Sequence, residues 1–254
     1  MKNPTNTKKE NSEFKNKVVL ITGSSRGIGK ATALLFAKYE SKVVINYSKS
    51  EKEANETLKE VQKLTDAIAI KCDVSDEKQV EKMIKTIMQK FGRIDILVNN
   101  AGYYIDGDEW DGTSDIWEKT LKVNLISVMN VSKYVAQIFQ KQKSGIIVNV
   151  SSRYSTAGQY ESLAYAASKA GIINVTQAYA KLLSKYGRAN AVSPHAVRAG
   201  YWLRAPKEEV EETIARSPAK RLIEPSEVAE VIIKLCSNVS SKITGQNVVV
   251  DGKN

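Results

Sequence analysis

Thr22-Gly23-Ser24-Ser25-Arg26-Gly27-Ile28-Gly29 decides the fold, because this stretch joins an apolar run to a segment with helical periodicity. Glycine lets the backbone turn sharply and approach a phosphate, and a helix N-terminus offers free N–H groups with partial positive charge. The spacing T-G-x-x-x-G-x-G therefore predicts a turn that binds the pyrophosphate of a dinucleotide. A purely structural turn in another α/β protein contains the same glycines, so the motif needs support from the rest of the chain.

The sequence on both sides of this turn alternates short apolar runs with longer helical patterns. Strands are expected at 17–22, 42–47, 67–71, 95–98, 145–150, 188–192 and 247–250, and helices at 27–39, 51–64, 76–91, 114–141, 162–186 and 225–236. The strands are continuously apolar, as in a parallel sheet that is covered on both faces. The pattern predicts an α/β fold with one Rossmann-like, doubly wound parallel sheet of about seven strands flanked by helices.

We expect residues 15–254 to form a single domain, since no repeat, low-complexity linker or charge break divides them. Residues 1–14 are polar and predict a short flexible tail. Residues 193–224 follow neither periodicity and are expected to form an irregular substrate loop. Within it, residues 193–216, with Tyr201, Trp202 and Pro206, are expected to form a mobile lid over the substrate. Ser226 precedes an apolar run and is a candidate N-cap for the last helix.

The composition excludes several function classes. Hydrophobic residues make up 42 % of the chain and the net charge is +10, but lysines and glutamates alternate locally and no arginine-rich block occurs. We therefore expect no nucleic-acid partner. The chain has no apolar stretch of membrane-spanning length and its N-terminus does not have the apolar core of a secretory signal. These features predict a cytoplasmic protein without a membrane partner.

Cysteine and histidine are too scarce for metal or nucleophile chemistry. Cys72 and Cys236 are far apart in apolar contexts and predict buried thiols in a reducing compartment. His195 is the only histidine, so Ser-His-Asp and Cys-His arrangements that need histidine elsewhere are excluded. We expect no metal site, because such a site needs several clustered ligands.

The end of the second expected strand bears on cofactor choice. A site for NAD usually places a carboxylate there to bind the ribose hydroxyls. This chain has Asn46-Tyr47-Ser48-Lys49, and its first carboxylate is Glu51. Arg26 and Lys49 are available to a 2′-phosphate, so NADP(H) is the preferred cofactor and NAD(H) remains an alternative. Both cations also suit an ordinary solvated surface.

Tyr165 and Lys169 lie four residues apart in an expected helix and so share one face. An ammonium about 6 Å from a phenol lowers its pKa by about two units at an effective dielectric constant of about 20, which makes the phenol a better proton donor. An isolated pair of this kind is more often a surface feature. Here Ser152, Asn99-Asn100-Ala101-Gly102 and Asp73-Val74 all end strands, at the edge where α/β folds bind ligands.

These motifs together are highly specific, and over residues 17–252 the chain resembles the short-chain dehydrogenase/reductase family. It is most similar to bacterial 3-oxoacyl-[acyl-carrier-protein] reductases and to glucose-dehydrogenase-like members. The resemblance implies an NADP(H)-dependent reduction of a carbonyl, with a 3-oxoacyl thioester as one substrate class. A sugar or alcohol dehydrogenase is an alternative, as is a cofactor-binding regulatory protein without turnover. The family is typically homotetrameric, so a homotetramer or a homodimer is expected, with the late helix and last strand at one interface.

The resemblance also implies a role for each matching residue. Tyr165 would be the general acid, Ser152 would donate a hydrogen bond to the substrate oxygen, and Lys169 would bind the nicotinamide ribose and lower the pKa of Tyr165. Asn124 would hold a water that connects Lys169 with solvent. The residues expected to bind cofactor are Gly23, Ser25, Arg26, Gly27, Ile28, Gly29, Asp73, Val74, Asn100, Ala101, Gly102, Tyr165 and Lys169.

The chain departs from the family pattern near the sixth strand. His195 replaces the glycine of a P-G pair, and Ala199 occupies the position of the threonine that holds the carboxamide. His195 is expected either in the substrate pocket or as an ordinary loop residue. Three arginines nearby, Arg153, Arg198 and Arg204, suggest an anionic substrate. Four aromatic residues have two possible roles: they form apolar walls of the substrate pocket, or they take part in ordinary packing. They are Tyr103, Tyr104, Trp110 and Tyr154.

Overall fold

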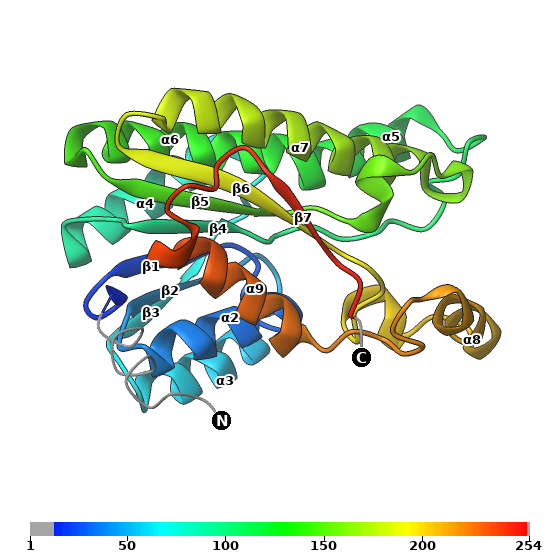
Figure 1. Cartoon of the computed structure of the whole chain (residues 1–254), viewed down its shortest axis with the longest axis horizontal. Helices are drawn as coiled ribbons and strands as arrows, with labels where there is room; N and C mark the ends of the chain where they lie inside the picture. The colour runs from blue at the N-terminus through cyan, green and yellow to red at the C-terminus, as the bar shows by residue number, and fades with distance from the viewer. Residues whose placement is uncertain (1–12, 253–254) are drawn as a thin grey trace.

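A parallel sheet forms the centre of the computed structural model, which describes residues 13–252 (Figure 1). Its strands in the described part of the chain are β1 (Val18–Ile21), β2 (Lys42–Tyr47), β3 (Ala67–Lys71), β4 (Ile96–Asn99), β5 (Gly145–Val150), β6 (Gly187–Pro194) and β7 (Asn247–Val250). They lie in the order β3-β2-β1-β4-β5-β6-β7, and every neighbouring pair is parallel. The predicted doubly wound sheet is confirmed.

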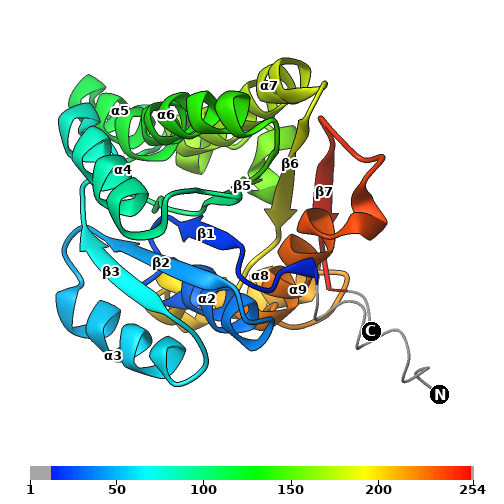
Figure 2. The same cartoon turned by 90° about the vertical axis from the view of Figure 1, so that its left-hand side faces the viewer.

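Helices cover both faces of the sheet (Figures 1 and 2). One layer contains α2 (Gly27–Lys38), α3 (Glu51–Gln62) and α9 (Pro225–Cys236), and the other contains α4 (Glu77–Phe91), α5 (Ser114–Leu121), α6 (Ser127–Gln142) and α7 (Leu163–Leu183). The chain crosses from one edge to the centre between β3 and β4, so β1 and β4 are neighbours at the topological switch point. Ligands of open α/β sheets bind outside the carboxyl ends of the strands at this point.

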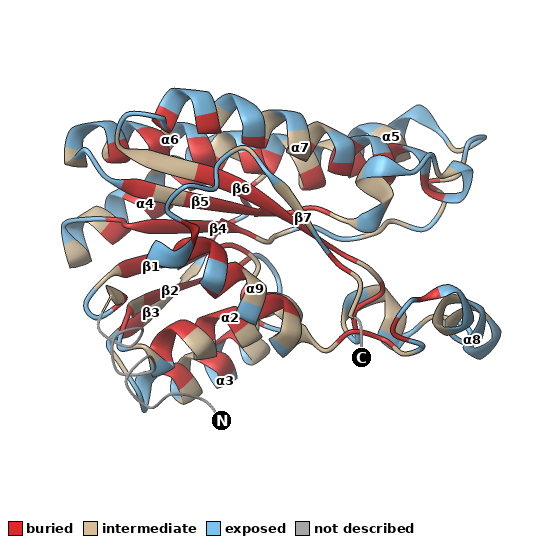
Figure 3. Cartoon of the chain, viewed as in Figure 1, coloured by how far each residue is buried: buried red, intermediate tan, exposed pale blue. Residues whose placement is uncertain are grey.

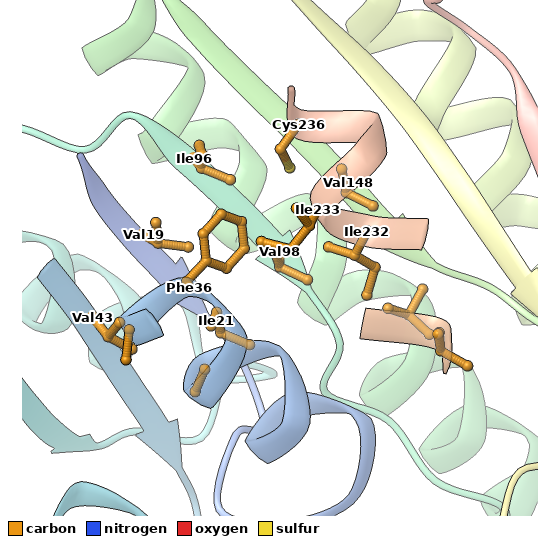
Figure 4. Close-up of a cluster of buried hydrophobic side chains, with 14 of the residues drawn as sticks. Val19, Ile21, Phe36, Val43, Ile96, Val98, Val148, Ile232, Ile233 and Cys236 are labelled. Carbon is orange, nitrogen blue, oxygen red and sulfur yellow. The ribbon is translucent and has the colours of Figure 1, made fainter. Parts of the chain in front are cut away.

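Each strand buries side chains on both faces, which explains the continuous apolar runs of the sequence. Val19 and Ile21 of β1 pack with Phe36 of α2 in one core, whereas Val18 and Leu20 pack in the other core on the opposite side. The ring of Phe36 lies between α2 and the sheet in Figure 4. Two separate cores thus hold the carboxyl edge of the sheet in place.

The N-terminal boundary of the folded part lies at or before Phe14. The predicted tail at residues 1–14 falls outside the described residues except for Glu13 and Phe14. Phe14 is buried and its ring packs against those of Phe36 and Tyr39, at centroid distances of 5.5 and 5.6 Å.

The predicted helical stretch 114–141 is helical throughout, with a π-helical turn (Lys122–Ile126) between α5 and α6. Two other expectations need correction. The loop 193–224 contains a helix, α8 (Lys207–Arg216), which has no buried residue and therefore little apolar periodicity (Figure 3). Ser226 does not cap α9: Glu224 occupies the N-cap, and its backbone N–H donates to Glu227 at 2.8 Å.

Candidate active site

The glycine-rich turn after β1 brings three segments of backbone into close contact. Gly23 has a φ of +61°, and a Cβ there would lie 2.8 Å from the Cα of Ala101. A Cβ on Gly29 would lie 2.6 Å from the Gly23 carbonyl and 2.7 Å from the Asn100 amide nitrogen. Gly27 opens α2 with a φ of +58°. This cradle leaves no space for side chains, so its backbone is open to a ligand at the helix N-terminus, which fits a pyrophosphate.

Asparagine and threonine side chains fix this turn to the neighbouring strands. Thr22 Oγ1 accepts hydrogen bonds from the backbone of Asn100 and Ala101, both at 3.0 Å. The Asn100 side chain donates back to the carbonyls of Thr22 and Gly23 at 3.0 and 2.9 Å. Its side-chain amide therefore holds the turn. Asn46 Oδ1 accepts from Gly23 N at 3.1 Å.

Asn46 was missed as a site residue by the sequence analysis, although a signal existed. Its side chain also donates to the carbonyl of Cys72 at 3.0 Å, so it connects the ends of β1, β2 and β3. An asparagine inside the otherwise apolar run Val43–Tyr47 must find partners when it is buried. That requirement pointed to a role at this edge of the sheet.

The expected adenine end is basic and open. Arg26 and Lys49 are exposed, and within residues 13–252 neither forms an ion pair. A cavity of about 290 Å³ lies beside the turn, lined by Arg26, Gly27 and Lys30 on one side and by the segment 198–203 on the other. Asp73 is exposed and accepts from Ser75, while Val74 is buried.

The four expected catalytic side chains meet at the carboxyl edge. The Ser152 side chain lies close enough to Tyr165 to lower the pKa of its hydroxyl. The Lys169 ammonium lies 5.4 Å from the Tyr165 ring centroid and donates to the carbonyl of Val150 at 3.2 Å. A Cβ on Gly102 would lie 2.5 Å from Asn124 Oδ1 and 3.4 Å from Lys169 Nζ, so Asn124 and Lys169 flank the same glycine.

Burial dominates the pKa values of the catalytic pair. It raises the pKa of Tyr165 to about 12, and the Ser152 side chain opposes this shift. It lowers the pKa of Lys169 to about 8. Burial is thus the largest influence on the pKa of both side chains in this structure, and a lowering of the pKa of Tyr165 by Lys169 stays a prediction. Tyr165 is protonated at neutral pH, the form required of a general acid.

Asn124 owes its position to the π-helical turn between α5 and α6. Its side chain donates to the carbonyls of Tyr103 and Thr120 at 2.9 and 3.1 Å, and it accepts from the backbone of Tyr103 at 3.0 Å. The wider turn adds one residue per hydrogen-bonded ring and is frequent at functional sites. Asn124 therefore holds the loop after β4 against Lys169.

Asp108 is a second residue that the sequence analysis missed. Its carboxylate is fully buried and accepts from the backbone of Ala164 at 3.2 Å and of Tyr165 at 2.7 Å. It satisfies the first turn of α7 from a different loop, because the N-cap residue Ser162 makes no capping bond. Burial raises the pKa of Asp108. No local pattern marks this residue, because its partners lie more than fifty residues away.

The segment after β6 packs against the loop after β4. Gly200–Leu203 form a short 3-10 helix in which Tyr201 packs on Tyr104, with ring centroids 5.1 Å apart. Two of the arginines that suggested an anionic substrate are paired: Arg198 with Glu224 at 2.7 Å and Arg204 with Asp106 at 3.2 Å.

His195 continues β6 and lies at the rim of the site. Its backbone N–H donates to Val250 at 3.0 Å, and its half-buried ring has a lowered pKa, because desolvation outweighs the attraction of Asp251. Nδ1 of His195 has no hydrogen-bond partner. Ala199 lies against the turn, 3.2 Å from the position of a Cβ on Gly27, and its methyl group donates no hydrogen bond to a carboxamide.

Two further findings concern residues 13–252 as a whole. They contain no group of three or more His, Cys, Asp or Glu side chains placed to hold a metal ion. Among their helices, none combines the length and apolar character needed to cross a bilayer.

A doubly wound parallel sheet with a glycine-rich turn after its first strand is the architecture of dinucleotide-dependent oxidoreductases. Residues 23–252 match the family model described as enoyl-(acyl carrier protein) reductase. The chain is 40 % identical over 238 residues to the 3-oxoacyl-[acyl-carrier-protein] reductase FabG of Thermotoga maritima, covering 93 % of this chain and 96 % of the relative. It therefore belongs to the short-chain dehydrogenase/reductase family, as the sequence motifs predicted, and is an oxidoreductase.

Other relatives agree with this assignment. The 3-oxoacyl-[acyl-carrier-protein] reductase of Synechocystis sp. is 38 % identical over 92 % of this chain and 95 % of its own length. Among solved structures, levodione reductase superposes with a TM-score of 0.88 at 31 % identity, covering 94 % of this chain and 97 % of that one. NAD⁺-bound xylitol dehydrogenase gives 0.87 at 30 % identity, covering 95 % and 100 %.

Proposed function

We propose that the enzyme is an NADP(H)-dependent oxidoreductase that reduces a carbonyl to a secondary alcohol, or catalyses the reverse. The observation that carries this proposal is the convergence of Ser152, Tyr165 and Lys169 beside the glycine-rich turn. A hydroxyl donor and a protonated phenol that meet at one point can bind and protonate a single carbonyl oxygen.

The residues present fit a dinucleotide. The cradle of Gly23, Ser25, Gly27, Ile28 and Gly29 would hold the pyrophosphate, and Arg26 the 2′-phosphate. Asp73 and Val74 would contact the adenine end of the cofactor. The ribose on that side would lie against the backbone of Asn100, Ala101 and Gly102. The nicotinamide ribose would lie against Tyr165 and Lys169. When bound, NADPH supplies the hydride and is oxidised to NADP⁺. This arrangement is supported by Gly23 and Gly29, where a side chain would clash with neighbouring backbone, so that the backbone of the turn is left open to the pyrophosphate.

The chain's own residues perform the proton chemistry. Ser152 hydrogen-bonds the carbonyl oxygen and positions it at Tyr165, whose Oη gives its proton to that oxygen. Lys169 binds ribose and stabilises the phenolate that the proton transfer leaves, which raises the strength of Tyr165 as an acid when the substrate is in place. Asn124 holds the loop that carries Gly102 and would hold a water that links Lys169 to solvent.

Relatives named 3-oxoacyl-[acyl-carrier-protein] reductases support a 3-oxoacyl thioester as the first substrate class to test. A second candidate, oxidation of a sugar alcohol or another secondary alcohol, is favoured by the superposition on xylitol dehydrogenase. A cofactor-binding protein without turnover is the third candidate, motivated by His195 and Ala199. Its test is NADPH binding without oxidation by any carbonyl compound.

Tyr165→Phe tests the function. We expect it to remove nearly all turnover of ketones and 3-oxoacyl thioesters, because the proton donor is lost, while the dissociation constant of NADPH changes by only a few-fold. Absorbance of NADPH measures turnover, and its fluorescence on binding measures affinity. A Tyr165→Phe enzyme that retained most of its kcat would contradict the proposed role.

Arg26→Ala tests the cofactor preference. It should weaken NADPH binding by about tenfold or more, since a charge-assisted hydrogen bond to phosphate is lost, and should change NADH binding by less than about twofold. Lys52→Ala, on the exposed surface of α3, serves as the charge-matched control. Equal losses for NADPH and NADH would argue against the NADP(H) assignment.

We also propose a homotetramer, or a homodimer, in the cytoplasm. Exposed apolar side chains near the end of α9 and on β7, namely Val239, Ile243 and Val249, support an interface there. Cys72 and Cys236 are buried and unpaired, as suits a reducing compartment. Light scattering of the purified enzyme measures the number of subunits.

A further inference from the structure

A continuous arc of aromatic rings passes through the catalytic tyrosine. Tyr154 and Tyr104 both pack edge-on against Tyr165, with centroid distances of 6.4 and 6.3 Å and interplanar angles of 88° and 81°. From Tyr104 the arc continues to Tyr201 at 5.1 Å and on to Trp202 at 5.3 Å. We call these five residues the aromatic arc. Its members come from the loops after β4, β5 and β6 and from α7, so they meet only in the folded protein.

The hydroxyl groups of two arc members, Tyr104 and Tyr201, are bound by residues outside the arc. The hydroxyl of Tyr104 donates to the carbonyl of Glu161 at 3.4 Å, and that of Tyr201 donates to the Glu209 carboxylate at 2.5 Å. Burial raises the pKa of Tyr104 to about 12 and raises those of Tyr154 and Tyr201 as well. The arc is therefore uncharged at neutral pH.

Carboxylates lie near Tyr104, three from the loop after β4 and one from α8. Asp106, Asp108, Glu109 and Glu209 all act on the hydroxyl of Tyr104, and each raises its pKa. The cation beside Tyr201 is Arg204, which lies 5.5 Å from the ring centroid and is already paired with Asp106, whereas Lys169 lies 5.4 Å from the ring centroid of Tyr165. A negatively charged substituent would meet repulsion here, whereas a neutral ring would not.

We propose that the enzyme selects carbonyl compounds with a flat, uncharged ring on the carbonyl carbon, with Tyr104 and Tyr154 as the specificity-determining residues. This inference rests on the proposed function. A carbonyl oxygen that accepts the proton of Tyr165 must lie within hydrogen-bond distance of its Oη, so the substituents on the carbon come within reach of both flanking rings. Aromatic rings prefer edge-to-face partners at 4.5–7 Å, the spacing already seen within the arc.

The selected reaction balances as a two-electron reduction. The carbonyl carbon gains a hydride from NADPH, its oxygen gains the proton of Tyr165, and the C=O π bond is replaced by C–H and O–H bonds. A 3-oxoacyl compound meets the proposal when the ring is attached to the ketone carbon. The inference therefore narrows the substrate class of the relatives without replacing it.

Two 3-oxoesters that differ only at the ketone substituent test the inference. Ethyl benzoylacetate carries a phenyl ring there and ethyl butyrylacetate carries a propyl chain. We expect wild-type kcat/KM to favour the phenyl ester by about tenfold or more. Tyr104→Leu and Tyr154→Leu should each reduce this preference by about two- to tenfold, the range expected for loss of one ring pair, because kcat/KM for the phenyl ester falls more than kcat/KM for the propyl ester.

Conservative variants separate a ring effect from misfolding. Tyr104→Phe and Tyr154→Phe keep the ring and lose the hydroxyl, so they should retain the preference. Tyr160→Leu, a tyrosine that is 65 % exposed close to the same site, should leave it unchanged. NADPH binding and the thermal midpoint of each variant show whether the fold is intact.

The possible results distinguish failure of the inference from failure of the proposed function. A wild-type enzyme that reduces both esters equally, or a preference that survives in both leucine variants, overturns the inference and leaves the proposed function standing. NADPH that binds but is oxidised by neither ester, by no other ketone and by no thioester overturns the proposed function, and the inference with it. Loss of the preference in the leucine variants but not in the phenylalanine variants supports it.

Discussion

At the scale of single residues, Tyr165, the proposed proton donor, is held by a side chain that no motif contains. Asp108 accepts the backbone N–H of Tyr165 at 2.7 Å and that of Ala164 at 3.2 Å, and its own carbonyl accepts from Leu163 at 2.7 Å. Three contacts at the first turn of α7 fix the point from which Tyr165 projects. We infer that Asp108 is a positioning residue.

Asp108→Asn should lower kcat by about tenfold or more, because its NH₂ group cannot accept one of the two N–H donors and the first turn of α7 must shift. NADPH affinity should stay within a few-fold, so the loss appears in kcat. Asp111→Asn, an exposed acid in the same loop, is the matched control and should retain activity. Steady-state kinetics with both variants measures the difference; equal activities would refute the positioning role.

At the scale of elements, the start of α9 depends on charge. The Glu227 carboxylate accepts two hydrogen bonds from the Arg221 guanidinium, at 2.7 and 2.8 Å, and one from the backbone N–H of Glu224 at 2.8 Å. These hydrogen bonds lower the pKa of Glu227 from 4.5 to about 2, and the contribution of Arg221 is the largest. The ionised form is the one that the folded state binds, so its stabilisation is complete above about pH 4.5 and is lost as the pH falls toward 2.

Glu227→Gln should therefore destabilise the protein by about 1 kcal/mol at pH 7, a modest value because the Arg221–Glu227 pair is one-third exposed and partly screened. The difference from wild type should shrink below pH 4.5, where the wild-type carboxylate begins to be protonated. Urea denaturation across this pH range checks it. Glu230→Gln, exposed on the same helix, should have no comparable effect, and a pH-independent difference would exclude the charge explanation.

Elements also differ in how well the sequence revealed them. The strands and the helices that pack on the sheet follow their apolar patterns closely, as with β2 (Lys42–Tyr47) and α3 (Glu51–Gln62). The helix α8 escaped prediction because none of its residues is buried. The π-helical turn at Asn124 escaped because one additional residue in a helix scarcely changes its apolar pattern.

At the scale of the whole molecule, two cores on opposite faces of the sheet keep the carboxyl edge rigid. Phe36 is fully buried in one of them, where α2 and α9 pack over β1 (Figure 4). The same helix α2 begins at the glycine-rich turn, so its packing determines where the turn lies. Folding stability and cofactor binding are therefore linked through α2.

Phe36→Ala should cost about 3–5 kcal/mol of stability, because it removes a buried ring and leaves a cavity. That cost is a large part of the stability of an ordinary domain, so the thermal midpoint should fall markedly. Leu64→Ala, at a side chain that is 47 % exposed, should change stability by no more than about 0.5 kcal/mol. A Phe36→Ala protein as stable as wild type would contradict the assignment of this core.

The sequence by itself determined the sheet, the glycine-rich turn and the four residues that meet beside it, because local periodicity and motif spacing carry that information. Tertiary structure alone decided the rest. Asp108, Asn46 and the aromatic arc join residues that are distant in sequence, and the pKa of Tyr165 depends on burial that no local pattern records. Contacts between loops arise only when strands that are far apart along the chain become neighbours, so their chemistry follows from packing and not from order along the chain.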